Sequence, residues 1–301
     1  MKKQSEDHDD LMIQIYLLIE PLFGQTELPL YMERFSNNKN PYFTDAELFT
    51  CAIFTEVIGC KNKKQGYRFI RNHYASWFPK LPQYEVYNRR LNKYHEALAY
   101  IFLILRNRYG ISPDSVGMVD TAPITVCQAH HAFHSRTAQP FVSKGYCPAK
   151  KKYYIGAKLQ IIAQKQIKGL PIPIDYHLET ASKHDLEIAK HTLPYVDIEN
   201  MDMYGDKAYI DKDFQLDLFE NNSINLITPI KKQKYQTELT LFQKAFNTIH
   251  SSIRQTIDTL FGWINERTGI ENASKVRSVE GLFYHINIKM VAAMIMLLFL
   301  L

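Results

Sequence analysis

Residues 117–125 read Gly-Met-Val-Asp-Thr-Ala-Pro-Ile-Thr, in which apolar and β-branched residues surround a single acid, Asp120. Side chains of these types fit a pleated, half-buried surface, so the stretch predicts a β-strand. A carboxylate in a buried strand is costly unless a metal ion or a paired cation compensates it. Asp120 is therefore either part of a functional site or an acid that closes the strand before the turn at Pro123.

Two further acids favour the functional site. Residues 201–207 read Met-Asp-Met-Tyr-Gly-Asp-Lys. They show the same pattern as the stretch around Asp120, with apolar residues leading to an acid, Asp206, at the end of a predicted strand. Asp258 stands on a later amphipathic stretch that predicts a helix. If the two strands are neighbours in one sheet, their acids can meet and the helix can cross beside them. Three carboxylates suit Mg²⁺ or Mn²⁺, and two such ions about 4 Å apart can activate an attacking oxygen and stabilise a leaving one.

The second part of the chain predicts an α/β fold, a mixed five-stranded sheet with flanking helices. Predicted strands cover residues 116–125, 153–164, 170–177, 200–205 and 224–228, and predicted helices cover residues 182–193, 211–221 and 239–266. The order βββαβαβα is typical of a mixed sheet with helices on its faces. Residues 290–301 are apolar but too few for a comfortable membrane span, so we expect a core helix there.

The first part predicts an all-α domain over residues 1–112, followed by the α/β domain over residues 113–301. Residues 110–114, Gly-Ile-Ser-Pro-Asp, form a natural linker between them. Residues 11–23 have helical spacing, and Thr44-Asp45-Ala46-Glu47 is a capping-box pattern before an apolar run.

Cations gather in the second half of this helical region. The predicted helix around residues 86–93 carries Arg89, Arg90 and Lys93. We interpret it as the DNA-contacting helix of a helix-turn-helix-like domain, and a small bundle with a solvated basic face is the alternative. The net charge of +5 and the pI near 8.8 permit a nucleic acid partner without requiring one.

Composition narrows the class of protein. The apolar fraction of 46% is ordinary for a globular protein and argues against wholesale disorder. The four cysteines form no CxxC pair, and the polar, acidic start is not a secretory signal. We therefore expect reduced thiols in a cytoplasmic protein.

Five motifs follow one another along the chain. They are Met118-Val119-Asp120-Thr121, Gly156-Ala157-Lys158-Leu159, Thr180-Ala181-Ser182-Lys183-His184-Asp185, Gly205-Asp206-Lys207-Ala208-Tyr209 and Ile253-Arg254-Gln255-Thr256-Ile257-Asp258-Thr259-Leu260-Phe261. In this order they resemble the DDE transposases of bacterial insertion sequences, within the broad insertion-sequence-four-like domain. The following Ala273-Ser274-Lys275-Val276-Arg277-Ser278 and Gly281-Leu282 resemble the insertion sequence nine-eighty-two group.

The resemblance implies an RNase H-like catalytic fold and two Mg²⁺ or Mn²⁺ ions held by Asp120, Asp206 and Asp258. These acids would carry the catalysis, and Arg254 would steady a phosphate or the acids. The implied partners are transposon-end and target double-stranded DNA, together with further copies of the chain, in a dimer, in the synaptic complex. The implied location is the bacterial cytoplasm at the nucleoid, without a membrane.

The sequence departs from the family at the third acid, which is normally Glu. Asp258 is shorter by about one C–C bond, about 1.5 Å, and catalytic geometry is sensitive at that scale. The alternative acid, Glu266, would lie about 12 Å further along a helix. Of the family's Tyr-Arg-Glu-Lys signature, Arg254 is present, but Ser251 and Asn265 occupy the Tyr and Lys positions.

Other basic and aromatic clusters are candidates for DNA contact. Lys150, Lys151 and Lys152 follow Tyr146 and precede Tyr153, a pattern that suits phosphate contact and base stacking. A second basic loop contains Lys231 and Lys232. A solvated loop is the alternative for both.

A zinc site is a weaker candidate, because the spacing of Cys127, His130, His131 and His134 fits no standard zinc module. His184-Asp185 is interpreted as the cap and support of a helix rather than as a catalytic dyad.

Three hypotheses about function follow. The first is a transposase that cleaves its terminal inverted repeats and transfers the strands to target DNA. The second is an RNase H-like structure-specific nuclease, which cuts without joining. The third is a catalytically decayed transposase that acts only as a DNA-binding protein, and Asp258 is the feature that would discriminate it.

Overall fold

The computed structural model describes residues 2–32, 41–109, 116–128, 137–148, 150–198, 200–232 and 234–300. The chain divides into two compact units. The helical unit comprises Met1–Leu105, Glu266–Ile270 and Lys275–Leu301, and the sheet unit comprises Arg106–Asn265 and Glu271–Ser274. The predicted domain boundary between residues 112 and 113 lies outside the described residues and stays a prediction.

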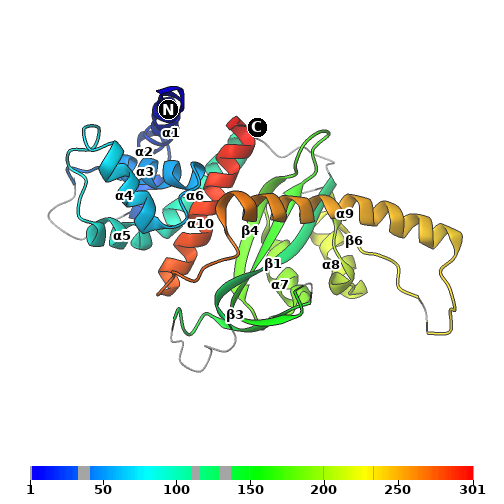
Figure 1. Cartoon of the computed structure of the whole chain (residues 1–301). Helices are drawn as coiled ribbons and strands as arrows, with labels where there is room; N and C mark the ends of the chain where they lie inside the picture. The colour runs from blue at the N-terminus through cyan, green and yellow to red at the C-terminus, as the bar shows by residue number, and fades with distance from the viewer. Residues whose placement is uncertain are drawn as a thin grey trace. The chain divides into compact units, whose positions relative to one another are not determined.

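The helical unit is built from helices and their connections, as predicted for the N-terminal region. They are α1 (Lys2–Ile19), α2 (Leu22–Gln25), the 3₁₀ helix η1 (Leu28–Met32), α3 (Asp45–Val57), α4 (Lys63–His73), α5 (Tyr84–Lys93), most of α6 (His95–Tyr109), the end of α9 (Leu241–Thr268), α10 (Val279–Ile295) and the π-helical turn η5 (Met296–Leu300) (Figure 1). Residues 11–23, which have helical spacing in the sequence, fall in α1 and α2, and Pro21 separates these two helices because it restricts the backbone before it.

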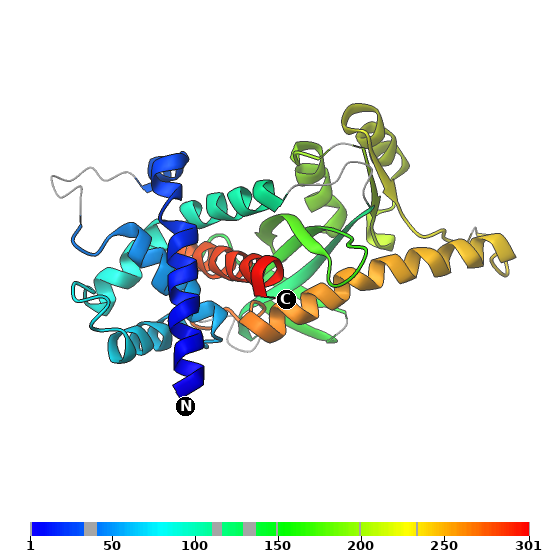
Figure 2. The same ribbon diagram turned by 90° about the horizontal axis from the view of Figure 1, so that it is seen from above.

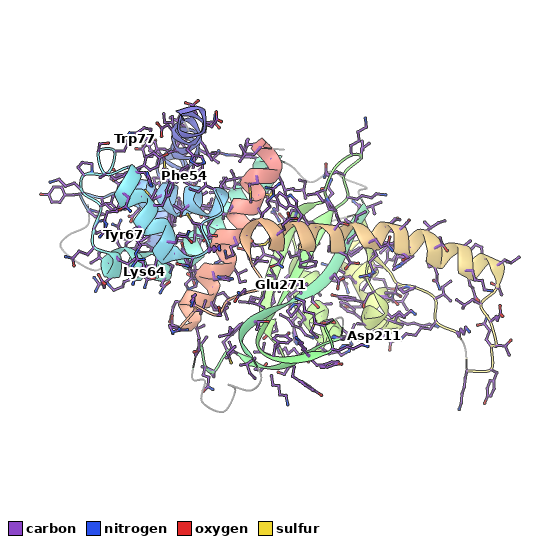
Figure 3. The ribbon with its side chains drawn as sticks, in the orientation of Figure 1. Phe54, Lys64, Tyr67, Trp77, Asp211 and Glu271 are labelled. Carbon is purple, nitrogen blue, oxygen red and sulfur yellow. The ribbon has the colours of Figure 1, made fainter. Side chains whose placement is uncertain are left out.

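Helix α3 begins at the predicted capping box. The Glu47 N–H donates to Thr44 Oγ1 at 3.1 Å, and the Thr44 N–H donates to Glu47 Oε2 at 2.5 Å. Its apolar run is buried almost throughout. Phe54 packs edge-on against Tyr74 with the ring centroids 5.6 Å apart, and Phe54 and Tyr67 lie among the helices of this unit in Figure 3. The core of the unit is therefore strongly aromatic.

The core helix predicted over residues 290–301 corresponds to the end of α10 and to η5, and α10 is largely buried whereas Phe299 and Leu300 at the end of η5 are exposed. By length and composition alone Val279–Leu300 could cross a membrane, but most of it is buried within the protein, as in the core helix of a soluble protein. Lys289 of α10 forms an ion pair with Glu56 of α3 at 2.8 Å and also donates to the Thr268 carbonyl. The two charged side chains are only 4% and 8% exposed, so each depends on the other for compensation.

Glu56→Gln is expected to destabilise the helical unit by about 3–5 kcal/mol, because it leaves the Lys289 ammonium charged and unpaired in the core. In a Trp263→Phe background, Trp77 is the only tryptophan and its fluorescence reports on this unit during urea unfolding. Adding Lys289→Met to Glu56→Gln is expected to recover much of the loss. An unfolding midpoint that Glu56→Gln leaves unchanged would contradict a stabilising role for the pair.

The sheet unit contains β1 (Val116–Gln128), β2 (Ser143–Cys147), β3 (Lys152–Gln164), β4 (Ile172–Thr180), α7 (Asp185–Thr192), η3 (Leu193–Tyr195), β5 (Met201–Tyr204), η4 (Lys207–Tyr209), α8 (Lys212–Asn222), β6 (Ile224–Ile227) and most of α9. The mixed α/β character is as predicted, but the prediction of five strands is wrong, since the described residues form six. The missed strand is β2, whose Lys144, Gly145 and Tyr146 show no run of apolar residues. It is a strand because its backbone pairs with β3 in antiparallel orientation.

Strand β1 lies at the centre of the sheet, antiparallel to β3 on one side and parallel to β5 on the other. Strand β6 continues the parallel side. The far edge of β3 is shared, because β2 pairs with its first residues and β4 with the rest. Gly156 of β3 lies so close to the Ile124 carbonyl of β1 that a Cβ atom there would collide with backbone.

The two faces of β1 meet different helices. Val119 belongs to a buried core with Ala189 of α7 and Leu218 of α8. The neighbouring Met118 faces α9, where Thr256 Oγ1 lies 2.7 Å from its sulfur. Figures 1 and 2 both show α9 running along the sheet. Side chains that alternate along β1 therefore point toward α7 and α8 or toward α9.

Candidate active site

Asp120 lies on β1, on the face that meets α9. Its Oδ1 accepts a hydrogen bond from the Thr121 N–H at 2.7 Å, and its Oδ2 accepts one from Arg254 Nη1 at 2.8 Å. The carboxylate is thus fixed on both oxygens, and only 17% of the side chain is exposed.

Asp206 follows β5, the strand that pairs with β1. Met118 of β1 is paired with Tyr204 of β5 in parallel, so Asp120 and Asp206 each lie two residues beyond a paired position. The two acid-bearing strands are therefore neighbours, which is the condition on which a meeting of their acids depends. Asp206 begins η4 by accepting the Ala208 N–H on Oδ1 at 2.6 Å, which fixes its side chain at the strand end.

Asp258 lies on α9, one helical turn after Arg254. Arg254 Nη2 donates to Asp258 Oδ2 at 2.9 Å while its Nη1 holds Asp120. One guanidinium therefore bridges an acid of the sheet and an acid of the helix. The role expected for Arg254, to steady a phosphate or the acids, stays a prediction, and in this structure its guanidinium contacts the acids.

The carboxylates of Asp206 and Asp258 both act electrostatically on Asp120. Burial raises the pKa of Asp120 to about 7, and the carboxylates of Asp206 and Asp258 add to the rise. The Thr121 N–H and the Arg254 guanidinium oppose it. Asp258, and not Glu266, is the carboxylate of α9 that takes part in this coupling. Glu266 belongs to the part of α9 that is grouped with the helical unit.

The donor set suits a hard divalent cation, although the side chains do not now form a closed cage. Among the described residues, no three His, Cys, Asp or Glu side chains are grouped closely enough to hold an ion. Arg254 instead contacts one oxygen atom each of Asp120 and Asp258. Carboxylates that repel one another around a desolvated acid need positive charge, and oxygen is the ligand that Mg²⁺ and Mn²⁺ prefer. The residues therefore fit such an ion by their chemistry.

A second polar network lies on the opposite side of β1. Thr121 Oγ1 donates to Asp185 Oδ1 at 3.0 Å, and Lys158 Nζ donates to the same oxygen at 2.8 Å. His184 is the N-cap of α7, where its Nδ1 accepts the Leu186 N–H, as the sequence predicted. Sequence reasoning assigned no role to Thr121 or Lys158. The available signal was a lysine in the middle of β3, between the apolar residues Ala157 and Leu159.

The candidate DNA-contacting helix is α5 of the helical unit. Arg89 and Lys93 are exposed on it. Arg90 is engaged within the unit, because its guanidinium donates to Asp45 Oδ1 at 2.6 Å and to the Phe43 carbonyl at 2.9 Å. DNA contact by α5 stays a prediction that rests chiefly on the two exposed cations.

The hairpin of β2 and β3 carries the second predicted patch. Lys151 and Lys152 are exposed, whereas Lys150 forms an ion pair with Glu271, which is labelled in Figure 3. Tyr146 and Tyr153 stand side by side with ring centroids 4.9 Å apart. Exposed rings and cations on one hairpin match the chemistry of phosphate contact and base stacking.

The third predicted patch follows β6. Lys231 and Lys232 are exposed, and Lys232 Nζ donates to the Thr237 carbonyl at 2.9 Å. Asn247 of α9 pins this loop through two hydrogen bonds to the backbone of Ile230. The start of the loop, at Ile230, is thus held against the helix that carries Asp258.

The zinc hypothesis falls largely outside the described residues, which do not include His130, His131 and His134. Cys127 is described and is a free, half-buried thiol.

Comparison with known proteins gives one family. A family model described as a transposase DDE domain matches residues 111–279, a range that contains Asp120, Asp206, Arg254 and Asp258. No curated protein and no solved structure matches the chain. The match does not test the finer resemblance to the insertion sequence nine-eighty-two group.

Proposed function

The chain belongs to the transposase DDE domain family, and we propose that it cuts DNA at the ends of its own insertion sequence and joins them to target DNA. The observation that carries this proposal is geometric: Asp120 of β1 and Asp258 of α9 each accept a hydrogen bond from Arg254, and Asp206 follows β5, the strand that pairs with β1. The sheet order β4-β3-β1-β5-β6 supports an RNase H-like catalytic fold.

The proposed chemistry has two steps. In the first, water attacks a phosphorus atom at the transposon end, and the P–O3′ bond breaks to leave a free 3′-OH. In the second, this 3′-OH attacks a phosphorus atom of target DNA and displaces another 3′ oxygen. Asp120, Asp206 and Asp258 would hold two Mg²⁺ or Mn²⁺ ions, which when bound supply activation of the attacking oxygen and stabilisation of the leaving one.

Arg254 would change partners during this reaction. It neutralises Asp120 and Asp258 in the free protein. A guanidinium also binds phosphate oxygens through paired hydrogen bonds. We infer that Arg254 turns from the acids to the DNA backbone once the acids are neutralised in another way.

The proposed partners are double-stranded transposon-end and target DNA, with a homodimer in the synaptic complex. Arg89 and Lys93 of α5, Lys151 and Lys152 of the hairpin, and Lys231 are the exposed cations that would contact phosphates. A bacterial, cytoplasmic location at the nucleoid follows from that substrate.

Strand joining separates this function from its alternatives. We expect the purified protein, given Mg²⁺ and a duplex from the flanking inverted repeats, to produce a 3′-OH end and to join it to plasmid DNA. A structure-specific nuclease would cut without joining. A protein that binds the ends but gains cleavage only as Asp258→Glu would support the decayed, binding-only alternative.

A further inference from the structure

Thr121 connects the candidate active site to the polar network behind β1. Its backbone N–H donates to Asp120 Oδ1, and its hydroxyl donates to Asp185 Oδ1 on α7. Neighbouring residues of a strand point to opposite faces of the sheet. Thr121 therefore touches the acid with its main chain and the network with its side chain.

Asp185 is itself held firmly. Lys158 of β3 donates to Asp185 Oδ1 at 2.8 Å and to the Lys183 carbonyl at 2.7 Å, and the two charged side chains are largely shielded, at 17% and 26% exposed. Asp185 is also the first residue of α7, where the helix dipole favours a negative charge. β1, β3 and α7 are thus tied together at one carboxylate oxygen.

Tyr209 indicates that this network and the catalytic acids lie around the same buried region. Its side chain is fully buried in the core beneath β1. Burial raises the pKa of its hydroxyl well above the usual range, and Asp120, Asp185 and Asp206 all act on it in the same direction. Asp185 is therefore close enough to share the electrostatic environment of two catalytic candidates.

We propose that Asp185 and Lys158 are positioning residues that act through Thr121 to fix the orientation of the Asp120 carboxylate. The inference rests on the proposed function for its catalytic meaning. Groups that hold a metal-binding carboxylate in place commonly change metal affinity or activity by about 10–100-fold when they are removed. The Lys158–Asp185 pair would hold Asp120 in the same way, but indirectly, because Thr121 lies between them.

Thr121→Val tests the connection directly. Valine keeps the β-branched shape and the backbone N–H but removes the hydroxyl that binds Asp185. We expect Mn²⁺ affinity, measured by calorimetry without DNA, to fall about 10-fold, and turnover to fall about 10–100-fold with an unchanged KM for the DNA end. Thr121→Ser, which restores the hydroxyl, is expected to recover both values. The matched control is Thr125→Val on the same strand, where the native residue bonds to Glu271 and Ala273 through its backbone.

A second variant tests whether Asp185 and Thr121 act on Asp120 through the same series of contacts. Asp185→Asn is expected to reduce Mn²⁺ affinity as Thr121→Val does, and the double variant to lose little more than either single one. Wild-type Mn²⁺ affinity in both single variants would overturn the inference and leave the proposed function intact. If the wild type bound Mn²⁺ but neither cut nor joined DNA, the proposed function would fail, while the Mn²⁺ comparison would still decide the positioning role.

Discussion

Asp120→Asn is expected to lower the rate of DNA-end cleavage by about 10³-fold. Asparagine keeps the size of the side chain and can still accept the Thr121 N–H. It is neutral, however, so it loses the charge that attracts Arg254 and would attract a divalent cation. The measurement is cleavage of an end-labelled duplex that carries the terminal repeat, in Mg²⁺ and separately in Mn²⁺.

The control for this variant is Asp217→Asn on α8, an exposed acid whose carboxylate accepts a hydrogen bond from Asn221. It removes the same charge at an exposed position whose hydrogen bond is to Asn221 and not to the catalytic candidates, and it should leave cleavage unchanged. Binding of the duplex in a gel-shift assay should survive in both variants, because the candidate DNA contacts lie elsewhere. Near-normal cleavage by Asp120→Asn would refute the assignment of Asp120 to the active site.

Local signals in the sequence predicted much of the fold. Thr44 and Glu47 form a capping box within four residues, so no knowledge of distant elements was needed to place the start of α3. The apolar and β-branched stretch around Asp120 likewise predicted β1. Strand β2 was missed, because its pairing with β3 rather than its own side chains makes it a strand.

The candidate site was only partly predictable, because its contacts join distant parts of the chain. The position of Asp206 beside β1 required the pairing of β1 with β5, which the sequence offered only as a condition. The Arg254 bridge between Asp120 and Asp258 depends on where α9 crosses the sheet. The Thr121, Asp185 and Lys158 contacts join three elements at one oxygen atom, and no spacing rule encodes such a meeting.

The basic residues of α5 could not be sorted from the sequence into exposed and engaged side chains. Charge alone could not distinguish Arg89, which is exposed, from Arg90, which is engaged with Asp45. Adjacent residues of a helix point in directions about 100° apart, so one side chain can bond within the unit while the next faces solvent. Tertiary packing decides which of them is available to DNA.

The identity of the third acid gives the second large expected effect. Asp258→Ala should lower cleavage by about 10²–10³-fold, because Asp258 couples to Asp120 and shares Arg254 with it. Glu266→Ala should change cleavage less than about 3-fold, since Glu266 would lie about 12 Å further along α9. Alanine has a higher helix propensity than either acid, so neither change is expected to lower cleavage by destabilising α9.

Asp258 is half exposed, which makes its replacement tolerable for folding and keeps the comparison clean. Equal melting temperatures for the two variants would confirm that any difference in cleavage is functional. A large loss in Glu266→Ala with a mild effect in Asp258→Ala would transfer the role to Glu266. That outcome would also require α9 to shift along β1, because in the present arrangement Arg254 ties Asp258, and not Glu266, to Asp120.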